Sequence, residues 1–305
     1  MKTYLCCMGA LFASFILLPS LAFSGGSAAP EEKPKSEETP DEITLIDGTE
    51  EKKLSLEDYI EGAVLAEMPA SYNEEALKAQ AVAARTYAVN KMHSHVHEGG
   101  ALCADFSCCQ AYIAPENYTG GEDNLSKVKK AVSETKGVIM TYDGEPITAV
   151  FHSMSAGKTA AASDVWGSDV PYLKSVDSSL EKTEENYETT VTVPITEFTG
   201  KLASLSSDYK GDLTIPPPER DSGGYVKRIT IGSVTFSGNA IRNLFSLRST
   251  NFNLGFSDGY AVFTVRGYGH GVGMSQHGAN LLAEKGENYK EILKTYYTGI
   301  KFGRI

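Results

Sequence analysis

A run of strong helix formers at residues 73–92 (NEEALKAQAVAARTYAVNKM) constrains the fold more than any other feature of this sequence. It predicts one long helix, because Ala, Leu, Lys, Gln and Arg all favour that conformation. Its Ala, Leu and Val side chains supply a face to be buried, so other elements must pack against it. A shorter helix is expected just before it, since Ser55 and Asp58 make a capping box and Pro69 stops the helix after Glu67.

Beyond Val138 the pattern changes to short runs with β-branched residues, and Asp143-Gly144 predicts a tight turn between two strands. Further strands are expected at residues 187–193, 225–231 and 260–267. Further helices are expected at residues 125–135, 239–247 and 288–297. With 41% hydrophobic residues the chain can build a core. The fold class is therefore predicted to be α+β, with helices at both ends of a strand-rich middle.

The N-terminal segment predicts export. Residues 4–23 carry no charge and follow Lys2. Residues 1–23 therefore form either an uncleaved membrane anchor or a signal peptide that is cleaved after residue 22. In both cases the rest of the chain lies outside the cytoplasm, held at the cytoplasmic membrane by a single anchor or secreted. Residues 24–54, rich in Gly, Ser, Pro and Glu, predict a flexible acidic linker before a globular domain at 55–305.

The charge balance excludes one class of partner. The chain has 28 Lys and Arg against 39 Asp and Glu, a net charge of −11, and no block of basic residues. Nucleic-acid binders need a concentrated basic surface to neutralise phosphates, so nucleic acid is not expected as a ligand.

Glu67 is the first candidate for chemistry. It lies on the same helical stripe as Leu56, Ile60 and Val64, so its carboxyl loses solvation when the helix packs. A neutral, positioned Glu can protonate a glycosidic oxygen. The alternative is a Glu at a helix end that reaches solvent, which is the usual state of a Glu side chain.

A second candidate is the Cys/His-rich stretch after the long helix. His93, His95 and His97 are followed by Cys103 and then by Cys108-Cys109. Three thiolates and one imidazole would complete a tetrahedral zinc site, with His97 as the fourth ligand. The alternative is a Cys103–Cys109 or Cys103–Cys108 disulfide that leaves one thiol over.

A third candidate is the run GYGHGVGMSQHGA at residues 267–279, in which four Gly surround His270. Gly-rich backbone can approach a ligand closely, and it can equally form a tight turn that packs the following helix. His152 stands alone at the end of a strand, where a structural role is more common.

Taken together, the motifs resemble the stage II sporulation protein D family. The resemblance covers most of residues 55–305 in collinear order. It rests on residues 57–89 (EDYIEGAVLAEMPASYNEEALKAQAVAARTYAV), 108–112 (CCQAY), 151–159 (FHSMSAGKT), 164–178 (DVWGSDVPYLKSVDS) and 267–279. It implies a membrane-anchored lytic transglycosylase that cuts peptidoglycan glycan strands stripped of stem peptides during forespore engulfment. It also implies stage II sporulation proteins P and M as partners, and a two-lobed body with a glycan groove between the lobes.

The resemblance also implies roles for individual residues. Glu67 stands at the family's catalytic acid, in the LAEMP motif. Substrate-binding roles are expected of Gln80, Tyr87, Ser153, Ser155 and Gln276. Some members hold zinc on a His/Cys loop; His97, Cys103 and Cys109 match that spacing, but Cys108 stands where a His is usual. A zinc ion on His97, Cys103, Cys108 and Cys109 is expected to be structural, since four protein ligands leave no open position.

Two rival functions remain open. Some relatives of the family are amidase enhancers, which bind wall polymer and stimulate a separate hydrolase without cutting glycan. A zinc-dependent wall amidase would need an open metal position, which the Cys-rich cluster does not offer.

Overall fold

The computed structural model describes residues 42–305, and the chain enters it through a β-hairpin. Strands β1 (Glu42–Asp47) and β2 (Glu50–Ser55) pair antiparallel, and β3 (Leu102–Cys103) adds to β1 in parallel. Residues 42–54 are therefore not a flexible linker, which corrects the sequence-based expectation for that segment. The physical reason is that Ile43 and Leu45 alternate onto one face and are buried in the core, although charged residues surround them in the sequence.

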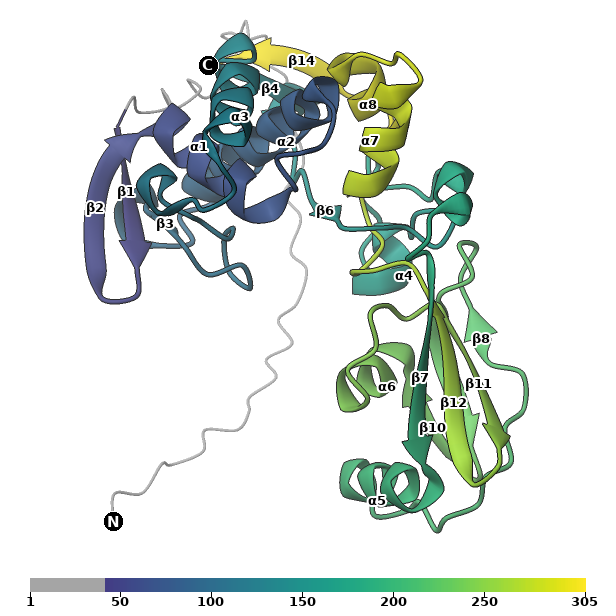
Figure 1. The fold of residues 1–305 in the computed structure, drawn as a ribbon. Helices are drawn as coiled ribbons and strands as arrows, with labels where there is room; N and C mark the ends of the chain where they lie inside the picture. Colours follow the sequence, from purple (N-terminus) through teal and green to yellow (C-terminus); the bar gives the residue numbers. More distant parts are fainter. Residues whose placement is uncertain (1–41) are drawn as a thin grey trace, which may run out of the picture. The chain divides into compact units, whose positions relative to one another are not determined.

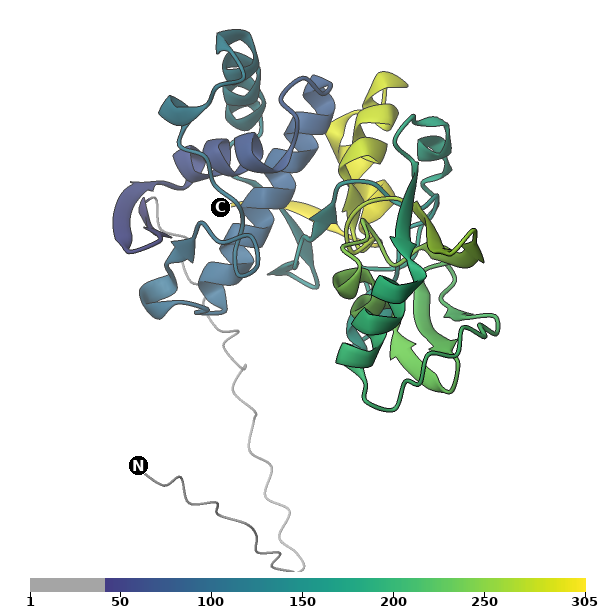
Figure 2. The ribbon, with the colours of Figure 1, turned by 60° about the horizontal axis from the view of Figure 1, so that its bottom comes forward.

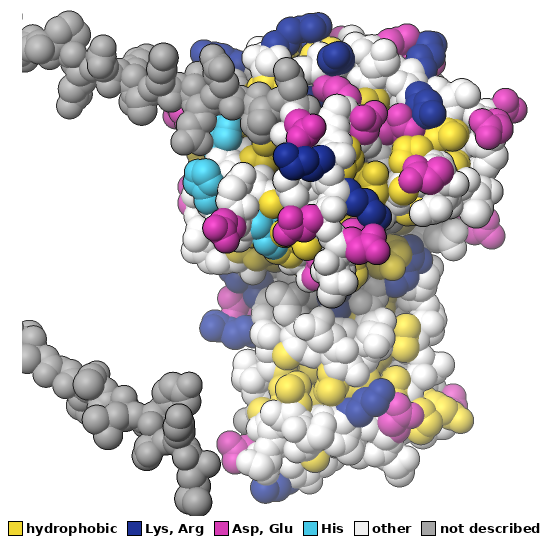
Figure 3. All heavy atoms as spheres, turned by 90° about the vertical axis from the view of Figure 1, so that its left-hand side faces the viewer, with side chains coloured by type: hydrophobic (Ala, Val, Ile, Leu, Met, Phe, Trp, Pro, Cys, Tyr) yellow, Lys and Arg dark blue, Asp and Glu magenta, His cyan; other side chains and the backbone are white. Residues whose placement is uncertain are grey.

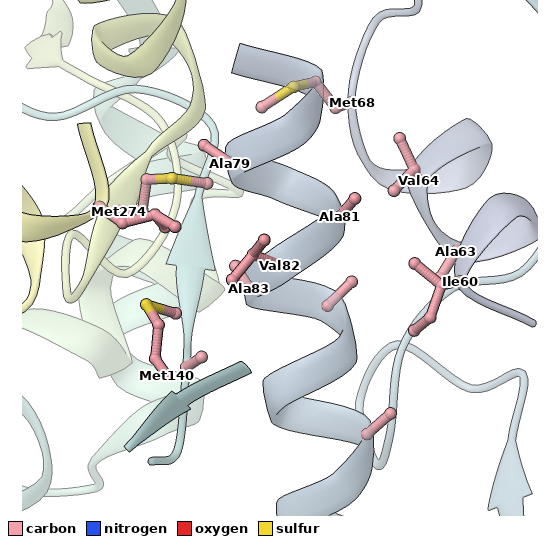
Figure 4. Packing of buried hydrophobic residues seen from close by; sticks show 14 of the residues in the cluster. Ile60, Ala63, Val64, Met68, Ala79, Ala81, Val82, Ala83, Met140 and Met274 are labelled. Carbon is pink, nitrogen blue, oxygen red and sulfur yellow. The ribbon is translucent and has the colours of Figure 1, made fainter. Parts of the chain in front are cut away.

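Three helices follow the expected pattern: α1 (Leu56–Glu67), α2 (Glu74–His93) and α3 (Glu122–Glu134). The Ser55 hydroxyl accepts a hydrogen bond from the Asp58 amide (3.1 Å) and so caps α1. Figure 4 shows that α2 is packed on two sides, with Ala81 toward α1 and Ala79 and Ala83 toward Met274 and Met140. The small Ala side chains let neighbouring elements approach α2 closely, so it is buried on nearly every side.

One ion pair is buried beside α2. Arg85 has a fully buried side chain, and its guanidinium donates to both carboxylate oxygens of Glu57 (2.9 and 2.5 Å) and to the Val138 carbonyl (3.2 Å). This bidentate contact joins α2 to α1 and to strand β4 (Val138–Tyr142).

The middle of the chain builds a second core from short strands. Two three-stranded antiparallel sheets, in the orders β11-β12-β7 and β10-β9-β8, carry it. Their bounds are β7 (Glu188–Pro194), β8 (Glu219–Arg220), β9 (Val226–Ile231), β10 (Val234–Ser237), β11 (Phe252–Ser257) and β12 (Tyr260–Arg266). Helices α5 (Ile195–Leu205) and α6 (Gly238–Leu244) pack against them (Figure 1). Phe198 of α5 stacks on Phe245 at 5.1 Å between ring centroids.

The last third of the chain returns to the first core. Helices α7 (Gln276–Glu284) and α8 (Tyr289–Tyr296) pack against α2 (Figure 2), and β14 (Lys301–Arg304) pairs with β4 in the sheet β14-β4-β5. Strand β5 (Glu145–Pro146) follows β4 through the expected turn, where Asp143 and Gly144 have positive φ. The α+β class, with helices near both ends of a strand-rich middle, is confirmed.

Two motifs that lie far apart in the sequence are joined by β6 (Phe151–His152) and β13 (Met274–Ser275), which pair in parallel. Gly273 allows this approach: its φ is +73°, and a Cβ there would collide with the Val150 carbonyl oxygen. The Gly-rich run therefore packs tightly against the β6 segment.

The remaining described elements are short. They are α4 (Ala162–Trp166) and the 3₁₀ turns η1 (Glu98–Gly100), η2 (Pro115–Asn117) and η3 (Ser179–Thr183). On the face seen in Figure 3, basic and acidic side chains are interspersed around the hairpin and the first helices. Within residues 42–305, no helix is both long and apolar enough to cross a membrane. The expected anchor or signal peptide at 1–23, its membrane contact through residues 4–23, and linker residues 24–41 lie outside the described residues.

Candidate active site and metal centre

A cavity of about 800 Å³ opens beside the C-terminal end of α1. Glu67, the last residue of α1, lines it. Tyr87 of α2, Ser153 after β6 and Gln276 at the start of α7 line it as well. Four of the residues expected at the site therefore meet around one cavity. The lining comes from elements of the first core and from the Gly-rich run; a groove between two lobes stays a prediction.

Glu67 is held by contacts from two other segments. Its Oε1 accepts a hydrogen bond from the Ala111 amide (2.9 Å), and its backbone carbonyl accepts one from Gln276 Nε2 (2.9 Å). Burial raises the pKa of the Glu67 carboxyl, while the Ala111 amide opposes the shift by stabilising the carboxylate. The site therefore favours a protonated Glu67 over a wider pH range than in water, as a general acid requires.

Two other expected residues are placed differently. Gln80 is fully buried on α2 and reaches the site only through its side-chain oxygen, which accepts from Gln276 Nε2 (3.4 Å). Ser155 is fully buried and is not a cavity residue, which corrects the expectation that it meets substrate. Its hydroxyl donates to Glu181 Oε2 (2.5 Å) and its amide to Glu181 Oε1 (3.0 Å).

Glu181 is a buried carboxyl that ties together three segments. Besides Ser155, it accepts hydrogen bonds from the hydroxyls of Ser178 (2.6 Å) and Ser275 (2.5 Å). Burial raises the pKa of Glu181, and the three serine hydroxyls oppose that shift. These contacts fix the backbone just after Ser153 and just before Gln276.

Two histidines form part of the cavity wall. His152 Nδ1 donates to the Val272 carbonyl (3.1 Å), and the Val272 amide donates to His270 Nδ1 (3.1 Å), so the backbone of one residue fixes the tautomers of both rings. Burial lowers the pKa of His152 to about 3 and that of His270 to about 4. Both rings are therefore neutral at physiological pH and act as polar but uncharged wall residues.

The metal candidates converge on one point. The ligand atoms of His97, Cys103, Cys108 and Cys109 all lie within 4.8 Å of one another, and the three cysteines are free thiols. His97 Nε2 lies 3.4 Å from Cys108 Sγ. A tetrahedral zinc site places sulfurs about 3.8 Å apart, so the cluster needs only a small contraction to fit. Three soft thiolates and an imidazole are the donor set that zinc prefers.

The metal cluster is coupled to the acid through a short segment of chain. Both the Cys108 and Cys109 amides donate to the Asp105 carbonyl (3.0 and 2.8 Å), which shapes the loop. Ala111, two residues after Cys109, supplies the amide that binds Glu67. Whatever holds the cysteines therefore also fixes a hydrogen bond to the carboxyl.

Several site residues were not found by sequence reasoning. Ala111 binds Glu67 through its backbone amide, so its side chain gives no signal in the sequence. Glu181 stands in a polar stretch without a motif, so it gives no local signal either. His152 and His270 stand in separate motifs, and nothing in either motif indicates that both rings contact the backbone of Val272. The exposed rings of Phe106 and Tyr268 also line the cavity.

Comparison with known proteins agrees with this architecture. Residues 47–142 match the family described as Stage II sporulation protein. The chain is 39% identical over 259 residues to Stage II sporulation protein D of Bacillus amyloliquefaciens, covering 82% of this chain and 74% of that protein. It is also 39% identical over 258 residues to the protein of the same name in Bacillus subtilis, covering 81% and 74%. The amidase enhancer of Bacillus subtilis is 30% identical over 292 residues, 79% of this chain but 39% of that longer protein.

The chain therefore belongs to the stage II sporulation protein D family, a family involved in sporulation.

Proposed function

We propose that this protein is a lytic transglycosylase that cleaves peptidoglycan glycan strands to 1,6-anhydro-N-acetylmuramic acid ends. The observation that carries the proposal is that Glu67 is the only carboxyl among the described residues lining the cavity. Glycosidases that use water normally need two carboxyl groups flanking the scissile bond. A single acid suits a reaction in which the substrate supplies its own nucleophile.

The reaction needs one group that gives and then takes a proton. Protonated Glu67 donates its proton to the glycosidic oxygen as the bond from C1 of N-acetylmuramic acid to that oxygen breaks. The Glu67 carboxylate then accepts the proton of the C6 hydroxyl of the same sugar, whose oxygen bonds to C1. No water is consumed, and Glu67 ends protonated for the next turnover. The raised pKa of Glu67 supports the first step.

Polar wall residues support substrate orientation. Tyr87, Ser153 and Gln276 line the same cavity as Glu67 and offer hydroxyl and amide groups to sugar hydroxyls or to the N-acetyl group. We assign Gln80 a supporting role, since it contacts Gln276 (3.4 Å) from the buried side.

The His97, Cys103, Cys108 and Cys109 cluster is proposed to hold a structural zinc ion. When bound, zinc would fix the loop that carries the Ala111 amide. Four protein ligands leave no position for a reactive water, so an amidase that uses this metal is disfavoured.

The cellular setting is proposed from the family. A member of this family would act on the wall during engulfment of the forespore, from the outer side of the cytoplasmic membrane, together with stage II sporulation proteins P and M. The apolar residues 4–23 would provide the anchor.

The test is product analysis with a matched control. The full chain, Glu67→Gln and Glu61→Gln are each incubated with glycan strands that lack stem peptides, and the products are identified by mass spectrometry. Glu61 is the control because it is also a half-buried Glu on α1 whose pKa is raised by burial, but it lies outside the cavity lining. Anhydro ends from the parent and Glu61→Gln, and none from Glu67→Gln, are expected.

A second function rests on the 30% identity to the amidase enhancer. Under that alternative the cavity binds wall polymer, and a separate amidase does the cutting. Retained glycan binding with no cleavage by the parent, together with stimulation of an added wall amidase, would replace the transglycosylase proposal.

A further inference from the structure

Phe106 is the most exposed large apolar side chain among the described residues, with 80% of its surface in contact with solvent, and it lines the Glu67 cavity. It stands between Cys103 and Cys108. The turn that carries it is fixed by Asp105, whose Oδ1 accepts from the Ser107 amide (2.8 Å). The turn is closed by polar contacts, and the exposure of the ring is unfavourable in the free protein. Because the ring stands in the lining of a cavity, a ligand that covers it explains its presence there.

Tyr268 presents a second exposed ring to the same cavity, with 47% of its surface exposed. Its backbone pairs with Met154 through two hydrogen bonds (3.0 and 2.7 Å). The Arg248 guanidinium lies 4.6 Å from the ring centroid, and Arg248 is itself held by the Asn186 carbonyl (3.2 Å). Tyr268 is thus held in place by its backbone and by Arg248 before any ligand arrives.

The chemistry of the cavity indicates which ligand fits these rings. Glu67 is the only Asp, Glu, Lys or Arg among the described lining residues, and the lining histidines are neutral. The lining therefore offers no Lys or Arg to the carboxylates of a peptide, and the nearby Arg248 guanidinium is already engaged with the Tyr268 ring and the Asn186 carbonyl. Pyranose rings have apolar C–H faces edged by hydroxyls, and N-acetyl groups add a methyl, so they suit aromatic surfaces flanked by neutral polar groups.

We propose that Phe106 and Tyr268 are sugar-stacking residues that determine the affinity of the site for the glycan strand. The proposal rests on the proposed function, which supplies the class of ligand. Phe106 reaches the cavity from the Cys/His loop and Tyr268 from the Gly-rich run, so two distant parts of the chain bind one strand beside Glu67. Because Phe106 lies between two cysteines of the cluster, a metal there also holds the ring in place for binding.

The test measures binding without cleavage. The full chain carrying Glu67→Gln is titrated calorimetrically with glycan strands that lack stem peptides. Adding Phe106→Ala or Tyr268→Ala is expected to raise Kd about tenfold each, the size of one lost aromatic contact. Phe106→Tyr keeps the ring and should restore the parent Kd. Tyr260→Ala is the matched control, since Tyr260 is equally exposed (46%) but lies outside the cavity lining.

The outcomes separate this inference from the proposed function. If the Glu67→Gln chain binds glycan and neither Phe106→Ala nor Tyr268→Ala changes its Kd, the stacking role is overturned, whichever reaction the protein catalyses. If the alanine variants raise Kd while the chain with its natural Glu67 cleaves no glycan, the stacking role is sustained and only the transglycosylase proposal is overturned. A parent that binds no glycan overturns both. Removal of metal by a chelator should raise Kd in the parent and have little further effect in Phe106→Ala.

Discussion

Replacing Glu181 with Ala should destabilise the protein more than any other single change to a charged residue beside the site. The side chain is fully buried and accepts four hydrogen bonds, from the Ser155 amide and from the hydroxyls of Ser155, Ser178 and Ser275. The substitution removes both carboxylate oxygens that accept these hydrogen bonds, and it leaves a cavity. It would leave the donors buried without partners.

The magnitude follows from the number of donors. A buried donor without a partner costs about 1–3 kcal/mol. The three hydroxyls can rotate toward other acceptors, so we expect a total loss of about 4 kcal/mol in the free energy of unfolding. For a domain of this size that loss lowers Tm by roughly 10 °C. Glu181→Gln keeps the volume and one acceptor oxygen, and should lose about half as much.

The assay is thermal unfolding followed by circular dichroism, with Glu185→Ala as the control. Glu185 is an exposed Glu four residues further along the chain and should leave Tm unchanged. Glycan binding should also weaken in Glu181→Gln, because Ser155 and Ser275 adjoin the cavity residues Ser153 and Gln276. A Glu181→Ala protein that melts within 2 °C of the parent would refute this account of the network.

Three further predictions follow from other parts of the structure. Cys103→Ser, or treatment with a chelator, should lower Tm by roughly 10 °C if metal at about a thousand times its Kd stabilises the folded state; equal melting with and without chelator would contradict a structural metal. Lowering the pH from 7 to 5 should destabilise the protein by about 2 kcal/mol through His152, because its pKa falls from 6.5 to about 3 on folding and the unfolded chain therefore takes up the proton first. Denaturant unfolding at both pH values should show a smaller loss in His152→Gln, and an identical loss would disprove this assignment. Leu45→Ala should cost about 3 kcal/mol, since Leu45 is fully buried in the core; no change in urea unfolding would mean that the hairpin is a linker after all.

How far the sequence determines this fold can be seen from particular elements. Helix α2 and the Asp143-Gly144 turn were predictable because their signals are local: helix propensity in one case and a two-residue turn pattern in the other. Helix α5 was missed because Ile195, Thr196 and Phe198 favour a strand locally, whereas the packing of Phe198 and Leu202 in the second core selects a helix.

The site shows the same division between local and long-range information. The position of Glu67 at the end of α1 follows from the apolar stripe and from Pro69, so its burial could be expected. The contact with the Ala111 amide and the burial of Ser155 against Glu181 depend on segments that meet only in the folded chain. The β1–β2 hairpin was hidden because its charged residues dominate the composition while two apolar side chains determine its packing.

The most direct test of the central claim is to run the reaction in water enriched in oxygen-18 and to weigh the new chain ends. The proposed route closes the C6 hydroxyl of the substrate onto its own C1, so Glu67 needs no water and no heavy oxygen should enter the product. The new ends should also weigh one water less than a reducing end. Heavy oxygen at C1 of the new ends would contradict the account, because it would make the protein a hydrolase that needs a second carboxyl beside Glu67.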